Sequence, residues 1–148
     1  MPQPTPYKIS FVEGNISTHK MTEAMQVHHE LKHSGAWNIF IGQVRADQIN
    51  ERTVGAIEYT CYEEMAEQSM VTIIDECSRE ISIDFVHILH SKGAVKAGEI
   101  CLFVAVACGH RKESFRACEL IVERLKKETP IWGKEIFEDK SHQWKVNN

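Results

Sequence analysis

The sequence lacks every short motif that marks a nucleotide, zinc or serine-hydrolase site. Its 148 residues contain no P-loop, no GxGxxG, no GxSxG, and no HExxH or CxxC spacing among eight histidines and five cysteines. No apolar run approaches the roughly 20 residues of a membrane-spanning helix. The N-terminus has neither the basic nor the apolar region of a secretory signal. We therefore expect a cytoplasmic protein without a metal site and without a membrane partner.

Cysteine pairs suited to disulfide bonds are also absent. The five cysteines are odd in number and far apart in the chain: Cys61, Cys77, Cys101, Cys108 and Cys118. Most of them fall on apolar positions of expected strands or helices, which is typical of reduced, buried thiols. A catalytic cysteine is the less favoured alternative, because none of the five lies in a reactive motif.

A strong net charge is missing, although the charge is unevenly distributed. Residues 1–108 carry 8 Lys and Arg against 14 Asp and Glu, whereas residues 109–148 carry 9 against 7. The first part therefore has a charge of −6 and the second part +2. A mildly basic region on an acidic body favours a local anion site. It argues against nucleic-acid binding, which needs a broad basic face.

The length and the hydrophobic patterns predict one domain over residues 1–148, with a short disordered tip at 1–6. Helical spacing of apolar residues predicts helices over 22–32, 63–82 and 113–128, the last with Phe115 facing inward. Strands are expected over 7–13, 36–44, 54–62, 83–90, 99–108 and 131–137. This order indicates an α+β fold with the helices on one side of a largely antiparallel sheet, and residues 7–13 at its edge.

The residues that could carry chemistry lie mostly near the C-terminus. Lys126 ends the last expected helix and Lys134 follows the Pro130–Trp132 turn, while His110 and Arg111 precede the same helix. Free backbone N–H groups and a guanidinium favour an anion at such a helix start. Lysine near a helix C-terminus is usually explained by the helix dipole alone, and His110 and Arg111 could equally be a cap and a surface residue. Read by itself, Arg45, at the end of a strand, is more typical of a surface ion pair.

An ordered set of short patterns runs from about Gly35 to Trp144. Its members are Gly35-Ala36-x-x-x-Phe40-x-Gly42-x-Val44-Arg45, Glu58-Tyr59, Tyr62, His90-x-x-Gly93, Gly98-Glu99, His110-Arg111-x-x-x-Phe115-x-Ala117 and Leu125-Lys126-x-x-x-Pro130-Ile131-Trp132-x-Lys134-Glu135. Each piece alone is weak, but the set with its order and spacing resembles the molybdopterin synthase catalytic (large) subunit family, MoaE.

The resemblance implies an αβ-hammerhead fold and a homodimer. It implies that a small ubiquitin-like, MoaD-like carrier subunit docks on each copy, giving a heterotetramer, and inserts a C-terminal Gly-Gly tail that ends in a thiocarboxylate. The family transfers sulfur from this thiocarboxylate to cyclic pyranopterin monophosphate, which forms the dithiolene of molybdopterin, a step of molybdenum cofactor biosynthesis. No metal and no other cofactor is implied.

The resemblance also implies roles for individual residues. Lys126 matches the main catalytic lysine, and Lys134 is the candidate for a second one. The substrate-binding positions implied by the match are Gln43, Val44, Arg45, His110, Arg111, Lys126, Gly133, Lys134 and Glu135. If these roles hold, guanidinium, imidazole and ammonium groups from three stretches of the chain surround one shared cavity.

This sequence departs from the family at Gly133, where a lysine is expected, and Lys134 follows one residue later. Besides the generic interpretation, a small α+β protein with no ligand at its cationic end, two hypotheses stay open. In the first, the chain is a sulfur-transferring enzyme. In the second, it is a homologue that binds the carrier or the pterin with weak or no turnover, because the lysine at position 133 is missing.

Overall fold

The computed structural model describes residues 3–147. The helices are α1 (Thr18–Met25), the 3₁₀ helix η1 (Gln26–Glu30), α2 (Glu63–Glu80) and α3 (Arg111–Glu128). The strands are β1 (Tyr7–Glu13), β2 (Ala36–Gln43), β3 (Gln48–Ile49), β4 (Arg52–Cys61), β5 (Phe85–Lys96), β6 (Ile100–Cys108), β7 (Ile131–Phe137) and β8 (His142–Trp144). The α+β class is confirmed.

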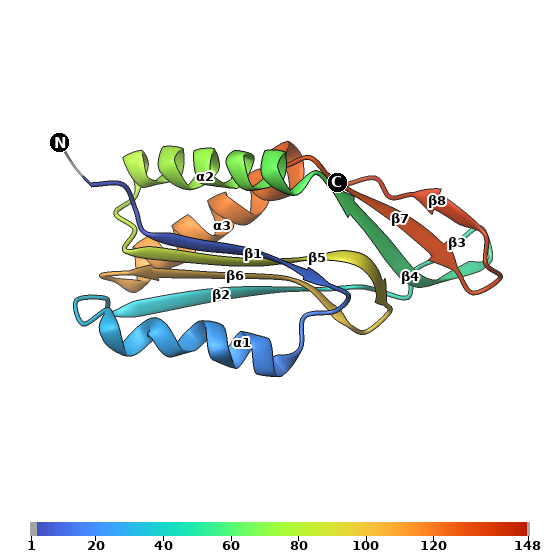
Figure 1. Ribbon diagram of the computed structural model, residues 1–148, viewed down its shortest axis with the longest axis horizontal. Helices are drawn as coiled ribbons and strands as arrows, with labels where there is room; N and C mark the ends of the chain where they lie inside the picture. Colours follow the sequence, from blue (N-terminus) through green and yellow to red (C-terminus); the bar gives the residue numbers. More distant parts are fainter. Residues whose placement is uncertain (1–2, 148) are drawn as a thin grey trace.

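The sheet has two parts that share the long strand β5 (Figure 1). The first half of β5 pairs with β6 and, in parallel, with β1, whereas its last residues pair with β4. Every other strand pairing among the described residues is antiparallel, and β1 pairs with β5 alone, so both predictions for the sheet are confirmed. Gly93 lies where β5 passes from one part to the other, with a φ of 77° that favours glycine.

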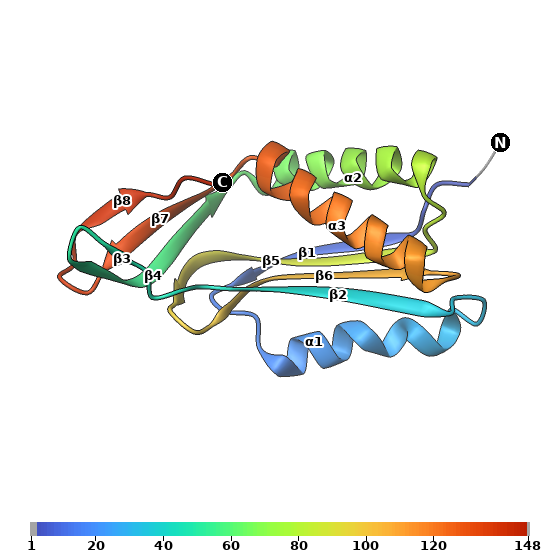
Figure 2. The same cartoon turned by 180° about the vertical axis from the view of Figure 1, so that it is seen from behind.

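Helices cover both faces of the main part of the sheet, so the prediction that they lie on one side is wrong. α2 and α3 lie on one face and α1 on the other (Figures 1 and 2). The physical reason is in β6, whose side chains are apolar on both faces: Leu102 and Val104 join the core under α2 and α3, and Phe103 joins the core under α1. A strand that is apolar on both faces needs cover on both.

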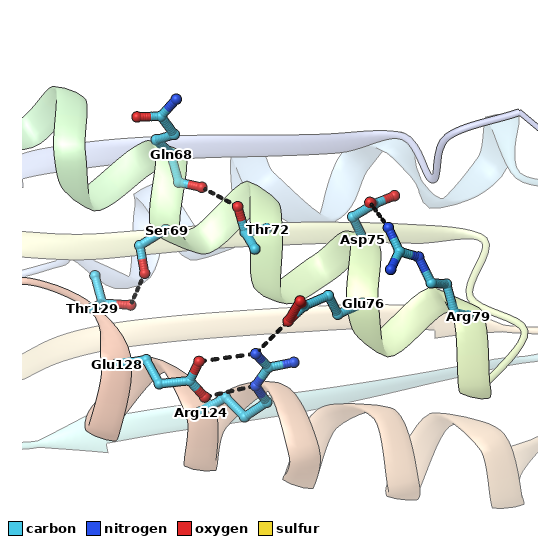
Figure 3. A network of polar contacts seen from close by, with 9 residues as sticks. All are labelled: Gln68, Ser69, Thr72, Asp75, Glu76, Arg79, Arg124, Glu128 and Thr129. Atoms are coloured by element: carbon cyan, nitrogen blue, oxygen red, sulfur yellow. Dashed lines mark hydrogen bonds and ion pairs between the residues drawn. The ribbon is translucent and has the colours of Figure 1, made fainter.

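Charged side chains join α2 to the C-terminal half of α3. Arg124 donates to Glu76 of α2 at 2.7 Å and to Glu128 at 2.6 and 2.9 Å, as Figure 3 shows. The hydrogen bonds to Glu128 and then to Glu76 raise the pKa of Arg124 well above its ordinary value. The hydroxyl oxygens of Ser69 in α2 and of Thr129, directly after α3, lie 3.4 Å apart. These contacts fix the last turn of α3 against α2.

Several local predictions need correction. α1 begins at Thr18 rather than residue 22, because the Ser17 hydroxyl caps it by accepting from the Lys20 N–H at 3.2 Å. Phe115, expected to face inward, is 59% exposed. In the expected disordered tip, Thr5 donates to Ser78 at 2.7 Å; Met1 and Pro2 lie outside the described residues. Within residues 3–147, no helix is long and apolar enough to cross a bilayer.

Candidate functional site

Two hollows adjoin beside the C-terminal end of α3, where the two parts of the sheet meet. The narrow hollow has a volume of about 60 Å³ and the wide hollow about 250 Å³. Four residues line both of them: Tyr59 of β4, Cys101 of β6, Lys126 of α3 and Lys145 of the C-terminal segment. Side chains from four distant stretches of the chain therefore meet at one place.

Lys126 occupies the last turn of α3, next to the boundary between the hollows. The Asn147 side-chain amide donates to the Lys126 carbonyl at 3.3 Å, so the C-terminal segment crosses the end of this helix. Among residues 3–147, no carboxylate lies within 4.0 Å of the Lys126 ammonium. Its charge is therefore available to an anion that enters from solvent.

His90 forms part of the wall of the narrow hollow as a neutral imidazole. Its Nδ1 lies 2.7 Å from the Ser91 carbonyl, which assigns the proton to Nδ1 and leaves Nε2 as an acceptor. Burial, and then the charge of Lys126, lower the pKa of His90 to about 4, although the hydrogen bond to Ser91 opposes the shift. Burial also raises the pKa of Tyr59, whose ring stands edge-on to His90 at 5.4 Å. Both rings are uncharged at neutral pH.

The predicted substrate-binding segment Gln43–Arg45 lines the wide hollow. Val44 is held there by backbone bonds to Glu99 at 3.0 Å and from Gly98 at 2.8 Å. The Arg45 guanidinium lies 3.3 Å from the Asp47 carboxylate, and 76% of its side chain is exposed. A surface ion pair of this kind is weak and can exchange its partner for a bound anion.

Strand β7 divides its residues between two faces. Gly133 lines the narrow hollow and Glu135, which is only 5% exposed, lines the wide one. Lys134 lies between them and faces the other way, with its ammonium 3.9 Å from Glu58 and 5.5 Å from the Trp144 ring centre. Alternation along the strand places Lys134 on the face away from the hollows, which argues against the predicted role of Lys134 as a second catalytic lysine.

His110 and Arg111 do not join Lys126 within one chain. They lie at the N-terminal end of α3, whereas Lys126 lies in its last turn. At 1.5 Å of rise per residue, the 15 positions between Arg111 and Lys126 separate them by about 22 Å. His110 occupies the N-cap position without a side-chain capping bond. Within one chain, Arg45 and Lys126 therefore line one hollow, whereas His110 and Arg111 lie at the opposite end of α3, and their predicted role in the same site stays a prediction.

Lys145 and Cys101 line the site although no sequence pattern indicates them, and Tyr59 and His90 line it although the resemblance implies no role for them. Lys145 enters the site because its N–H donates to the Gly133 carbonyl at 2.7 Å, directly after the three-residue strand β8 pairs with β7. A strand so short gives almost no signal in the sequence. Cys101 is 8% exposed and its thiol donates to the Gly42 carbonyl at 3.5 Å, as expected for a reduced, structural cysteine.

Comparison with known proteins shows the family of the chain. Residues 12–128 match the family described as MoaE protein. The chain belongs to the MoaE family. The resemblance found in the sequence is thereby confirmed, and the match includes Lys126 while the segment with Gly133 and Lys145 lies beyond it.

Relatives and solved structures support the assignment. The chain is 39% identical to the molybdopterin synthase catalytic subunit of Bacillus subtilis (strain 168) over 115 residues, which is 78% of this chain and 72% of that one. The crystal structure of molybdopterin synthase from Staphylococcus aureus has a TM-score of 0.77 at 29% identity, and the match covers 99% of this chain and 100% of that one. The complex of subunits 1 and 2 of molybdopterin-converting factor from Helicobacter pylori 26695 has a TM-score of 0.78 at 18% identity, covering 95% and 91%.

Family membership identifies the chain as an enzyme subunit, since the curated MoaE relatives are catalytic subunits of molybdopterin synthase. It also agrees with the fold, because the matched structure at 29% identity covers 99% of this chain. The α+β architecture is therefore shared with the Staphylococcus aureus molybdopterin synthase structure.

Proposed function

We propose that this MoaE family member is the catalytic subunit of a molybdopterin synthase. In this proposal it transfers sulfur from the C-terminal thiocarboxylate of a small ubiquitin-like carrier to cyclic pyranopterin monophosphate, without a cofactor. The observation that carries the proposal is the position of Lys126: a lysine with no carboxylate partner within 4.0 Å, among the described residues, lines two adjoining hollows of different size. The names of the MoaE relatives support the reaction class.

The two hollows suit the two substrates. A Gly-Gly tail has no side chains, so the end of such a tail suits the narrow hollow, whose volume is about 60 Å³. The bicyclic pterin with its phosphate needs the wide hollow of about 250 Å³, where Arg45 provides a forked donor for phosphate. Lys126 lines both and can contact the thiocarboxylate and the pterin together. An ammonium in that position stabilises the negative charge that develops during acyl transfer.

The proposal includes the carrier and a homodimer. The related Helicobacter pylori protein was solved as a complex of its two subunits, which supports a small partner for this chain. If His110 and Arg111 bind substrate at the Lys126 site, they must come from a second copy, because about 22 Å of α3 separates them from Lys126 within one chain. A mixture of Lys126→Ala and Arg111→Ala subunits tests this directly. Activity regained on mixing supports sites shared between copies, and no regain argues against a role for the pair.

The test of the function is a reconstituted sulfur-transfer assay with thiocarboxylated carrier and cyclic pyranopterin monophosphate. We expect Lys126→Ala to lower turnover by about 100-fold or more, the range for losing a positioned charged group in a reaction centre. Lys127→Ala is the matched control: Lys127 is the next residue, 3.7 Å from Glu123, and its side chain is 68% exposed. Equal turnover in the two variants would contradict the role of Lys126, and no turnover by the wild-type chain would contradict the function.

A second candidate function is binding of the carrier or pterin without turnover. The absence of a side chain at Gly133 favours it, since the family resemblance implies a lysine there. The same assay separates the two hypotheses. Tight carrier binding without product would establish the second, and robust product formation would exclude it.

A further inference from the structure

The C-terminal segment places a second lysine beside Lys126. The backbone N–H of Lys145 donates to the Gly133 carbonyl at 2.7 Å, which extends the pairing between β8 and β7 by one bond. Trp144, one residue earlier, lies on the outer face against Lys134. Alternation therefore directs Lys145 to the inner face, and it lines both hollows together with Lys126.

A side chain at position 133 would force its surroundings to shift. A Cβ built on Gly133 would lie 2.9 Å from Ile57 Cγ2 and 3.4 Å from the Tyr59 ring. Ile57 is 4% exposed and part of the main core, so it has little room to move. Side chains of β4 therefore occupy the space that a Gly133 side chain would need. Lys145 of the C-terminal segment lines the same hollow as Gly133.

The charges around the narrow hollow leave an excess of positive charge. Among residues 3–147, the charged side chains that line it are Lys126 and Lys145 alone, since His90 is neutral and no Asp or Glu of this range lines it. No ion pair within 4.0 Å occupies Lys145 in the part of the chain that the structure describes. The wide hollow differs, because Asp47 and Glu135 offset two of the three cations that line it. Two lysines without counter-ions favour an anion in the narrow hollow.

We infer that Lys145 is the second cation of the site and binds, with Lys126, the carboxylate or thiocarboxylate at the end of the carrier tail. The inference rests on the proposed function and adds a residue to it. Lys145 supplies from the C-terminal segment a positive charge that Gly133 lacks. Its backbone bond to Gly133 does not depend on the side chain, so substitutions at Lys145 keep the segment in place.

The experiment measures how strongly the site prefers a charged tail end. The carrier is prepared with its Gly-Gly tail ending either in a carboxylate or in an uncharged amide, and binding to each is measured by calorimetry. We expect the wild-type chain to bind the carboxylate form at least about tenfold more tightly, the range for a charge-assisted hydrogen bond. In Lys145→Ala the preference should fall by about tenfold, whereas Lys145→Arg should keep most of it.

Lys127→Ala again serves as the control and should retain the wild-type preference. A preference unchanged in Lys145→Ala, or no preference in the wild-type chain, would overturn the inference. A merely structural role would weaken binding of both carrier forms equally and would not be rescued by arginine. Turnover of the wild-type chain is measured separately. Turnover by a wild-type chain that shows no preference for the carboxylate form would contradict the role of Lys145 alone. Absence of turnover would contradict the proposed function.

Discussion

The exclusion of a side chain at position 133 is the structural feature that most affects the interpretation of this site, and Gly133→Ala tests it. The added Cβ would lie 2.9 Å from Ile57 Cγ2. Carbon atoms in contact prefer about 3.5–4.0 Å, so β4 and β7 must separate by several tenths of an ångström or Ile57 must leave its position. Neither is easy in a closely packed sheet.

The expected change in the free energy of unfolding of Gly133→Ala is the sum of two opposing contributions. Overpacking of a core site costs about 1–3 kcal/mol. Replacing glycine by alanine in a strand with ordinary backbone angles returns about 0.5–1 kcal/mol. The net change should therefore be a loss of about 1–2 kcal/mol in the free energy of unfolding. A lysine at position 133 meets the same obstacle, so Gly133→Lys should not raise turnover.

Urea unfolding monitored by tryptophan fluorescence measures the change from the shift in midpoint at constant slope. Gly55→Ala is the matched control, because Gly55 lies in the adjoining strand β4 and its added Cβ would meet only atoms at 3.5 Å or more. That variant should be as stable as the wild-type chain or slightly more so. If Gly133→Ala proves at least as stable as Gly55→Ala, Ile57 and Tyr59 do not close the position, and the argument for Lys145 loses its steric basis.

Three further predictions concern stability and the surface. Arg124→Met should lower the free energy of unfolding by about 1–2 kcal/mol, because it removes the charge-assisted bonds between α2 and α3; an unchanged urea midpoint would show that they contribute nothing. The pKa of His90 is lowered to about 4 from an ordinary 6.5, so the unfolded chain takes up the proton first and stability falls as the pH drops from about 7 to 4, by about 3 kcal/mol at the acid limit. His90→Gln should flatten this slope in unfolding experiments across that range, and an unchanged slope would refute the shift. Phe115→Ser should change stability by less than about 0.5 kcal/mol in the isolated chain, since the ring is 59% exposed, and a large loss would indicate that it is buried.

Much of the fold could be predicted from local patterns. The stripe of Ala66, Met70, Ile73, Ile74 and Cys77 is buried as its helical spacing indicates, and β7 has the predicted bounds. The position of α1 could not be read in the same way. This helix is short and Ala24 is its one buried residue, so the spacing of apolar residues carries little information. The continuous apolar run of β6 nevertheless indicates that both faces of the sheet are covered.

The candidate site was predictable only where sequence neighbours share a location. Gln43, Val44 and Arg45 are adjacent and line one hollow together. His110 and Lys126 were expected to meet because both flank one helix, but the length of that helix holds them apart. Lys145 depends on a long-range pairing with Gly133 that no local pattern reveals.

The most direct test of the account compares sulfur transfer by two lysine variants from the same stretch of chain. Lys126 faces the hollows and Lys134 faces away from them, toward Glu58 and Trp144. Single-turnover transfer from thiocarboxylated carrier should fall by about 100-fold or more in Lys126→Ala and stay within about twofold of wild type in Lys134→Ala. A large loss in Lys134→Ala, with Lys126→Ala unaffected, would place the chemistry on the opposite face of β7 and contradict the account.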